Sequence, residues 1–79
     1  MARYYFDLEN GRPGRDEEGT ALPTLLSVRE AAVEMLGQVL RDKRGTFWDD
    51  PDVKLTVRSD DDLILMRLTV FGTLAPACC

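Results

Sequence analysis

The sequence contains no histidine, and its only cysteines are Cys78 and Cys79 at the C-terminal end. Histidine is the commonest general base and metal ligand, so its absence excludes serine–histidine and cysteine–histidine catalysis within one chain. Adjacent cysteines have no distant partner, and a bond between neighbours closes a strained ring, so we expect two reduced thiols. Two thiols without further ligands also make a poor zinc site.

Long apolar runs are missing as well. No stretch approaches the roughly 20 residues that a membrane-spanning helix requires, and Ala2, Arg3 and Tyr4 do not resemble a signal peptide. We therefore expect a cytoplasmic protein that does not bind membranes. With 14 acidic and 10 basic residues the net charge is −4, which disfavours nonspecific binding of the whole molecule to nucleic acid.

The N-terminal residues predict a β-hairpin. Residues 3–8 are rich in aromatics and alternate, with one face formed by Tyr4, Phe6 and Leu8. Turn formers over residues 9–14 reverse the chain. The charged residues 15–18 then predict a short second strand at a sheet edge, where charge discourages pairing with other molecules.

Residues from 24 to about 43 predict one helix. Thr24 or Ser27 can be its N-cap, and Ser27 with Glu30 has the spacing of a capping box. Basic residues near position 43 suit the negative end of the helix dipole, and Gly45 is the expected stop. Helical spacing predicts a core face made of Leu25, Val28, Ala32, Met35 and Val39.

The apolar arc of this helix is wider than one sheet can cover. Leu26, Val33 and Leu40 lie seven residues apart, beside Leu36. Something further must cover this stripe. The alternatives are the Phe47-Trp48 segment folding back and a second molecule, and the sequence leaves both open.

The C-terminal half predicts a second hairpin. Residues 53–58 alternate with Val53, Leu55 and Val57 facing inward. A turn over residues 59–62 leads to a last strand over 63–71, whose inward residues are predicted to be Ile64, Met66, Leu68 and Val70. The result is an α+β domain of order ββαββ over residues 1–72, one amphipathic helix on a four-stranded antiparallel sheet, with a flexible tail over 73–79.

Acidic residues cluster at positions 16–18, 49–52 and 60–62. None of these clusters has the ligand spacing of a calcium loop, so we interpret them as solvated turns. Paired carboxylates that hydrolyse glycosides need a cleft, and no glycine-rich phosphate loop precedes the helix. We expect no catalytic residues, no cofactor and no metal, and hence no enzyme.

The outer face of the sheet supports two interpretations. Basic side chains interleaved with an aromatic one can form a stacking platform for single-stranded nucleic acid, here Arg3, Tyr5, Lys54, Arg58 and Arg67. Exposed apolar clusters instead usually mark protein interfaces. The interface candidates are Tyr5, Leu65 and Phe71 on the sheet and Leu26, Val33 and Leu40 on the helix. The acidic total charge favours an interface.

The order of motifs resembles a known family. Arg3-Tyr4-Tyr5-Phe6-Asp7-Leu8, Gly11, the run Arg15-Asp16-Glu17-Glu18-Gly19-Thr20 and Leu22-Pro23 are similar to short uncharacterised proteobacterial proteins that form a domain of unknown function. These open with an Arg-Tyr-Phe-Phe-like strand, continue through Arg-Asp-Glu-Glu-Gly and enter an alanine-containing helix after Leu-Pro. The resemblance implies no activity and no site residues.

A weaker resemblance is to antitoxins of the HicB type. These also pass through a hairpin and a Leu-Pro turn into a helix with alanines, and they bind a small toxin. Their order usually has three strands before the helix, where two are predicted here. The sequence therefore predicts a small non-catalytic binding or regulatory module that forms a homodimer, with nucleic-acid binding or an antitoxin role as the alternative.

Overall fold

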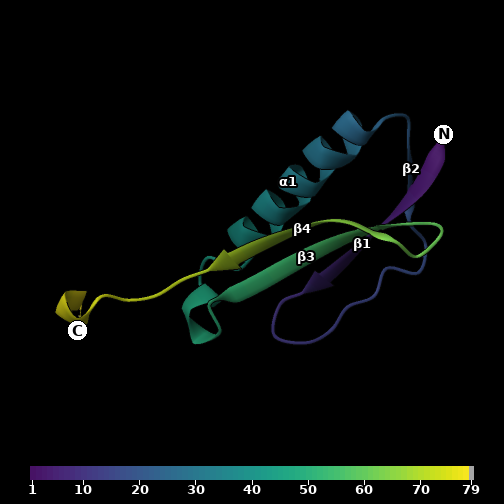
Figure 1. The fold of residues 1–79 in the computed structure, drawn as a ribbon. Helices are drawn as coiled ribbons and strands as arrows, with labels where there is room; N and C mark the ends of the chain where they lie inside the picture. The colour runs from purple at the N-terminus through teal and green to yellow at the C-terminus, as the bar shows by residue number, and fades with distance from the viewer. Residues whose placement is uncertain (79) are drawn as a thin grey trace.

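The computed structural model describes residues 1–78 and has one helix packed on a four-stranded antiparallel sheet (Figure 1). The elements follow the chain as β1 (Ala2–Glu9), β2 (Thr20–Leu22), α1 (Leu25–Asp42), β3 (Asp52–Ser59) and β4 (Ile64–Phe71). The strand order in the sheet is β2-β1-β3-β4. The predicted ββαββ order and α+β class are confirmed.

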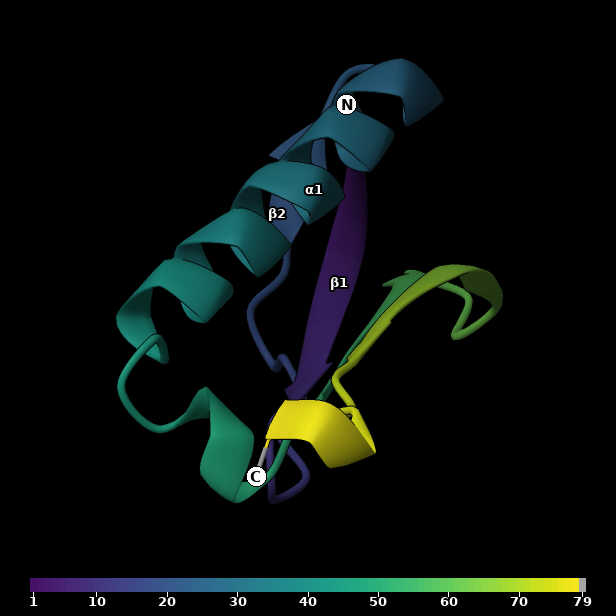
Figure 2. The ribbon, with the colours of Figure 1, turned by 90° about the vertical axis from the view of Figure 1, so that its left-hand side faces the viewer.

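The core lies between α1 and one face of the sheet. Val53, Leu55 and Val57 of β3 are fully buried, as the alternation predicted. They pack against Val28 and Ala32 of α1, which are fully buried too. In the view of Figure 2, α1 overlaps β2 and the start of β1, and the β3–β4 hairpin extends to one side.

The second strand lies later in the chain than predicted. Residues 15–18 form a turn, because the side chain of Asp16 accepts hydrogen bonds from the backbone N–H groups of Glu18 and Gly19. Gly19 has a φ of 73°, which ends this turn in a conformation that suits glycine. Pairing with β1 starts only at Thr20, opposite Tyr4. β2 nevertheless takes the edge position predicted for the second strand.

Helix α1 is capped at its first turn by Thr24 and Ser27. Thr24 Oγ1 accepts from the Ser27 N–H at 3.0 Å, and Ser27 Oγ accepts from the Thr24 N–H at 3.1 Å. This reciprocal pair is the capping box, so the predicted box of Ser27 with Glu30 is wrong. The helix ends at Asp42, close to the predicted end.

The buried arc of α1 is centred nearer Ala32 and Leu36 than predicted. Leu36 is 7% exposed, whereas Leu25, predicted to lie in the core, is 57% exposed. Met35, Val39 and Leu40 are partly buried against the core. Leu26 and Val33 are each 62% exposed, so within residues 1–78 nothing covers this part of the second stripe.

The Phe47-Trp48 segment packs elsewhere. It forms a short 3-10 turn over Phe47–Asp49, in which the two rings meet edge to face with centroids 5.3 Å apart. Both rings lie against Gly72, where a Cβ atom would be 2.9 Å from each of them. Phe47 thus closes the end of the core beside the C-terminus of β4, and Leu26 and Val33 stay exposed.

The β3–β4 hairpin turns at residues 59–62, as predicted. The Asp62 N–H donates to the Ser59 carbonyl, and Asp62 has a φ of 66°. A bulge between Val57 and Arg58 pairs Arg58 with Ile64 and leaves Leu65 without a partner. Ile64 therefore shares the outer face with Arg58 and is 58% exposed, which corrects its predicted inward position.

The chain after β4 leaves the sheet (Figure 1). Residues 73–78 are exposed and end in a single turn over Pro76–Cys78. Cys79, the last residue of the predicted tail and one of the two predicted thiols, lies outside the described residues. Among residues 1–78, no helix has the length and apolar character needed to cross a membrane.

The capping box gives a first test of the helix. Replacing Thr24→Ala removes the acceptor of the Ser27 N–H and should lower the free energy of unfolding by about 1 kcal/mol. Thr46→Ala is the matched control, because Thr46 precedes the 3-10 turn without any side-chain capping bond. Urea unfolding followed by circular dichroism, with all proteins at one concentration, measures both. Equal losses in the two variants would contradict the assigned cap.

Candidate functional site

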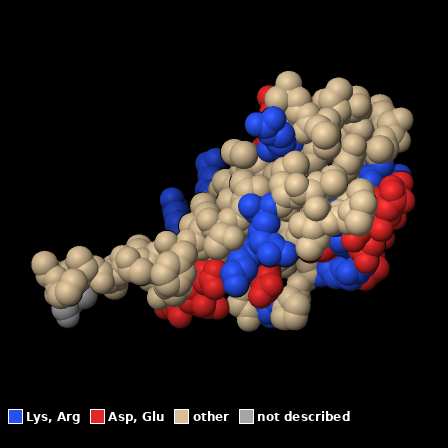
Figure 3. Space-filling view, viewed as in Figure 1, with Lys and Arg blue, Asp and Glu red and all other residues tan. Residues whose placement is uncertain are grey.

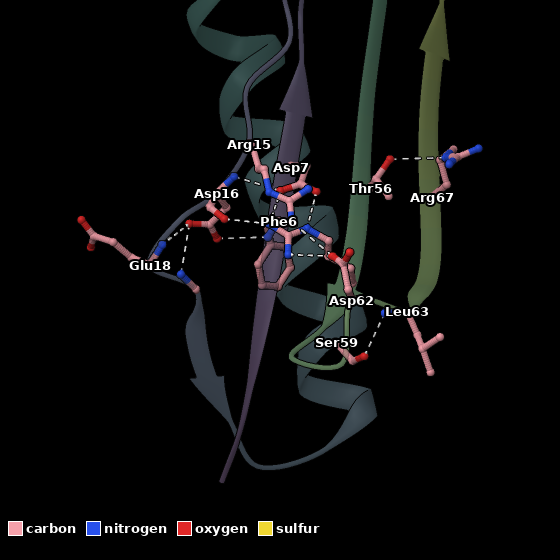
Figure 4. Close-up of polar contacts among 12 residues, drawn as sticks. Phe6, Asp7, Arg15, Asp16, Glu18, Thr56, Ser59, Asp62, Leu63 and Arg67 are labelled. Carbon is pink, nitrogen blue, oxygen red and sulfur yellow. Dashed lines mark hydrogen bonds and ion pairs between the residues drawn. The ribbon is translucent and has the colours of Figure 1, made fainter.

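Arg58 of β3 joins three segments on the outer face of the sheet, and Figure 4 shows the residues around it. Its Nε and Nη2 atoms donate to the two carboxylate oxygens of Asp7 on β1 at 2.6 and 3.2 Å. Nη2 also donates to the backbone carbonyl of Asp16 at 2.8 Å, and Nη1 to Asp62 at 3.2 Å. Arg58 is 8% exposed as a result, the one buried charged residue among residues 1–78.

Two neighbours complete the environment of this guanidinium. It lies over the ring of Tyr5, with Cζ 4.7 Å from the ring centroid, because Tyr5 is the cross-strand partner of Arg58. Arg15 forms an exposed ion pair with Asp62 at 3.2 Å. The side chains of Arg58, Asp7, Asp16 and Asp62 are called the arginine cluster below.

Asp16 closes the edge of β1 beyond the end of β2. Its carboxylate accepts from the Phe6 N–H at 3.1 Å, and its own N–H donates to Asp7 at 2.9 Å. One step further along, the Leu8 N–H donates to the Gly14 carbonyl at 3.0 Å. Gly14 is needed for this approach, because a Cβ atom there would lie 2.6 Å from the Leu8 carbonyl oxygen. Residues 14–16 thus replace a neighbouring strand.

Opposing effects set the acid–base properties of the cluster. Burial alone would raise the pKa of Asp7. The hydrogen bonds from Arg58 and from the Asp16 N–H, together with the charge of Arg58, outweigh this effect, so the pKa of Asp7 lies below its usual value. Burial likewise raises the pKa of Asp16, and the N–H groups of Gly19, Phe6 and Glu18 bring the net pKa below its usual value. The hydrogen bond to Asp7 raises the pKa of Arg58. Asp7, Asp16 and Arg58 are therefore charged near neutral pH.

The side chains predicted to contact nucleic acid interact with other residues of the same chain. Arg58 is held in the arginine cluster, and it covers the ring of Tyr5. Arg3 Nη1 donates to the Glu18 carbonyl at 2.9 Å. Lys54 Nζ lies 3.8 Å from Asp52, and Arg67 Nε donates to Thr56 at 3.3 Å. Figure 3 shows acidic side chains gathered toward the two ends of the folded body and basic ones scattered between them.

The predicted interface residues fall into separate groups. Leu65 and Phe71 are 40% and 69% exposed and stand near the two ends of β4. Leu26 and Val33 are exposed on α1. Leu40 and Tyr5 are only half-exposed, since Leu40 packs on the core and Tyr5 lies under Arg58.

One feature of the sheet was missed by sequence reasoning. β4 forms an edge, with β3 as its only strand neighbour in the described part of the chain. The signal was available in its composition, because Ile64–Phe71 is eight residues long and contains a single charge, Arg67. Natural edge strands of that length usually carry more charge or a proline.

The remaining hollows of the surface are shallow. One of about 230 Å³ is lined by Glu9, Asp50, Asp52, Lys54 and the loop at Gly11–Pro13. Its carboxylates do not converge, and within residues 1–78 no group of three or more acidic or cysteine side chains could hold a metal ion. The charged side chains of the arginine cluster hold the loop at Asp16 and the turn at Asp62 to the sheet.

The comparisons with known proteins agree with the sequence resemblance at the level of the family. Residues 3–72 match a protein family described as a domain of unknown function, DUF6894. The match covers both hairpins and the helix, so the chain belongs to this family. No curated protein and no solved structure matches the chain.

Asp16→Asn tests whether the cluster holds the loop on β1. An amide cannot accept from Phe6, Glu18 and Gly19 together, so the variant should lose about 1–2 kcal/mol of unfolding free energy at pH 7. Because the folded-state pKa of Asp16 lies below its usual 3.8, the carboxylate stabilises the fold above that pH and less below it. The difference from the parent should therefore shrink as the pH falls below about 3.8.

Glu17→Gln is the matched control for this experiment. Glu17 is the exposed neighbour of Asp16, so the unfolding free energy of this variant should stay within about 0.5 kcal/mol of the parent. Urea titrations at several pH values give both curves. A pH-independent loss in Asp16→Asn would disprove the role of its negative charge.

Proposed function

We propose that this member of the DUF6894 family is a small, non-catalytic binding or regulatory module that works as a homodimer. The observation that carries the proposal is the apolar surface left exposed beside an unpaired edge strand. Leu65 and Phe71 are exposed on β4, and Leu26 and Val33 on α1. Exposed apolar side chains that gather on one element usually mark a contact with another protein.

The size of the domain supports the same proposal. Within residues 1–78, the buried apolar core consists of seven side chains. Small domains bury a modest share of their surface and commonly gain stability by association. A second molecule that covers the surplus apolar residues would add burial at roughly 25 cal/mol per Å². The resemblance to proteobacterial proteins and the thiol at Cys78 suit a bacterial, cytoplasmic module.

Self-association is tested by light scattering behind size-exclusion chromatography on reduced protein. The parent should elute as a dimer of the 8.9 kDa chain. Leu65→Glu or Val33→Glu should shift it to a folded monomer, because each places a charge in a surface that the dimer buries. Val33 is the better test position on the helix, because Leu40 packs on the core and its substitution would also disturb folding.

Leu74→Glu is the control for these variants. Leu74 is 57% exposed, like the test residues, but it belongs to the segment that leaves the sheet. This variant should stay dimeric. A monomeric parent would disprove the proposal, and a dimer in which neither Leu65→Glu nor Val33→Glu has an effect would show that the interface lies elsewhere.

Nucleic-acid binding is the second candidate. Arg67 and Phe71 favour it, because both are exposed and alternate on the outer face of β4. Against it stand the internal partners of Arg3 and Arg58 and the net charge of −4. An antitoxin of the HicB type is less favoured, because two strands precede the helix here.

A direct binding assay decides this second candidate. We expect no salt-dependent change in the fluorescence anisotropy of short labelled oligonucleotides at about 50 mM salt, where phosphate contacts are strong. Lys54→Glu with Arg67→Glu serves as the comparison, because it removes the exposed or half-exposed basic side chains of β3 and β4. Binding by the parent that this double variant loses would overturn the expectation.

A further inference from the structure

We propose that the second copy pairs with the first edge to edge, β4 against β4, antiparallel and centred on Leu68. The two four-stranded sheets then become one continuous sheet with a two-fold axis at its middle. This inference rests on the proposed function, because it names the partner and the contact of the self-association.

The two edges of the sheet differ in how their backbone groups are paired. On the β2 side, the N–H groups of Phe6 and Leu8 already donate to Asp16 and Gly14. That edge is closed by the loop and cannot accept another strand along these residues. The β4 edge has no such cover in residues 1–78, and Figure 1 shows β4 along the open border of the sheet. An open edge of this length is a template for another strand.

The free backbone groups of β4 can be identified by alternation. The Gly72 N–H donates to the Pro51 carbonyl, at the end of the β3–β4 ladder. Since facing pairs alternate along an antiparallel ladder, Met66, Leu68 and Val70 bond to β3. The N–H and C=O groups of Arg67, Thr69 and Phe71 therefore point to the open side.

The sequence of β4 selects one register. Around Leu68 the residues read apolar, apolar, polar, apolar, polar, apolar, apolar in both directions, from Leu65 to Phe71. Pairing centred on Leu68 sets Arg67 opposite the partner's Thr69 and Leu65 opposite the partner's Phe71. A two-fold axis normal to the sheet puts the helix-side faces of the two copies on the same side of the joined sheet. The nearest alternative pairings with this symmetry are therefore centred on Arg67 or on Thr69.

Both competing registers are poorer. A centre at Arg67 sets the two Arg67 side chains directly opposite each other, which is unfavourable for like charges. A centre at Thr69 shortens the overlap, because β4 ends at Phe71. In the Leu68 register the open N–H and C=O groups of Arg67, Thr69 and Phe71 all lie opposite residues of the partner strand. Each hydrogen-bonded pair of residues then forms two main-chain hydrogen bonds.

The same pairing covers the apolar side chains that one copy leaves open. Met66, Leu68 and Val70 face the helix side but are only half-buried in one copy. In the dimer these side chains meet their counterparts across the axis. On the outer face the exposed Phe71 gains the partner's Leu65 as its cross-strand neighbour.

The exposed helix stripe turns toward this edge as well. Met35 of α1 lines a hollow with Phe6, Leu8 and Thr20, so that flank of the helix faces the β2 side. Leu26 and Val33 lie on the flank away from Met35, at 3.6 residues per turn, and therefore face the β4 side. Both surplus apolar surfaces thus turn to the β4 side of the sheet, which is the side that a second copy would occupy.

Disulfide trapping tests the register. In a background of Cys78→Ser and Cys79→Ser, three single variants are prepared: Arg67→Cys, Leu68→Cys and Thr69→Cys. After mild oxidation, Leu68→Cys should be mostly cross-linked, because the residue on the axis faces its own copy at a distance that a disulfide can bridge. The other two single variants should stay mostly uncross-linked. An equimolar mixture of Arg67→Cys and Thr69→Cys should form the mixed dimer.

A second variant tests the edge without a new thiol. Thr69→Pro removes an N–H that points to the open side and that the fold does not use, so it should give a folded monomer. Thr73→Pro, beyond the sheet, should remain dimeric. A parent dimer in which Arg67→Cys or Thr69→Cys links to itself more than Leu68→Cys would overturn this register and leave the proposed function intact. A monomeric parent would overturn both.

Discussion

The outer half of the molecule depends on the hydrogen-bonded ion pair between Arg58 and Asp7. The loop between β1 and β2 spans residues 10–19 and has no apolar side chain that reaches the core. Its position comes instead from polar contacts, because Arg58 binds the Asp16 carbonyl and Asp16 binds the edge of β1. A buried guanidinium tolerates this position only when its donors are matched, and four of its N–H contacts are to oxygen atoms of three aspartates.

The sequence was sufficient for features that arise from local periodicity. Alternation located β1, β3 and the inward side chains of β3, and helical spacing located α1 to within a residue of its ends. It failed where a distant partner or an irregularity decides the outcome. Arg58 finds Asp7 across 51 positions of the chain, which no local pattern reveals. A bulge turns Ile64 outward. The charges of residues 15–18 suggested a strand, but hydrogen bonds to the Asp16 side chain fold them into a turn.

Distant partners also decide the surroundings of the residues predicted to contact nucleic acid. The nucleic-acid interpretation treated basic residues on one face as free charges, whereas their distances to carbonyl and carboxylate oxygens show that Arg3 and Arg58 hold the fold together. The run Arg15-Asp16-Glu17-Glu18-Gly19, part of the region matched by the family, acquires a structural meaning. Asp16 supplies the capping carboxylate, and Gly19 supplies the positive φ that returns the chain to β2.

An asymmetry between the sheet edges links stability to association. Three residues of β2 and the polar loop suffice to close one side, so little apolar burial is available there. β4 carries its apolar side chains at the opposite side, where α1 covers them only in part. If a second copy completes that side, part of the burial that stabilises each chain is intermolecular. Folding and dimer formation are then coupled by mass action, so the unfolding midpoint should rise with protein concentration, as expected for any partner that binds only the folded state.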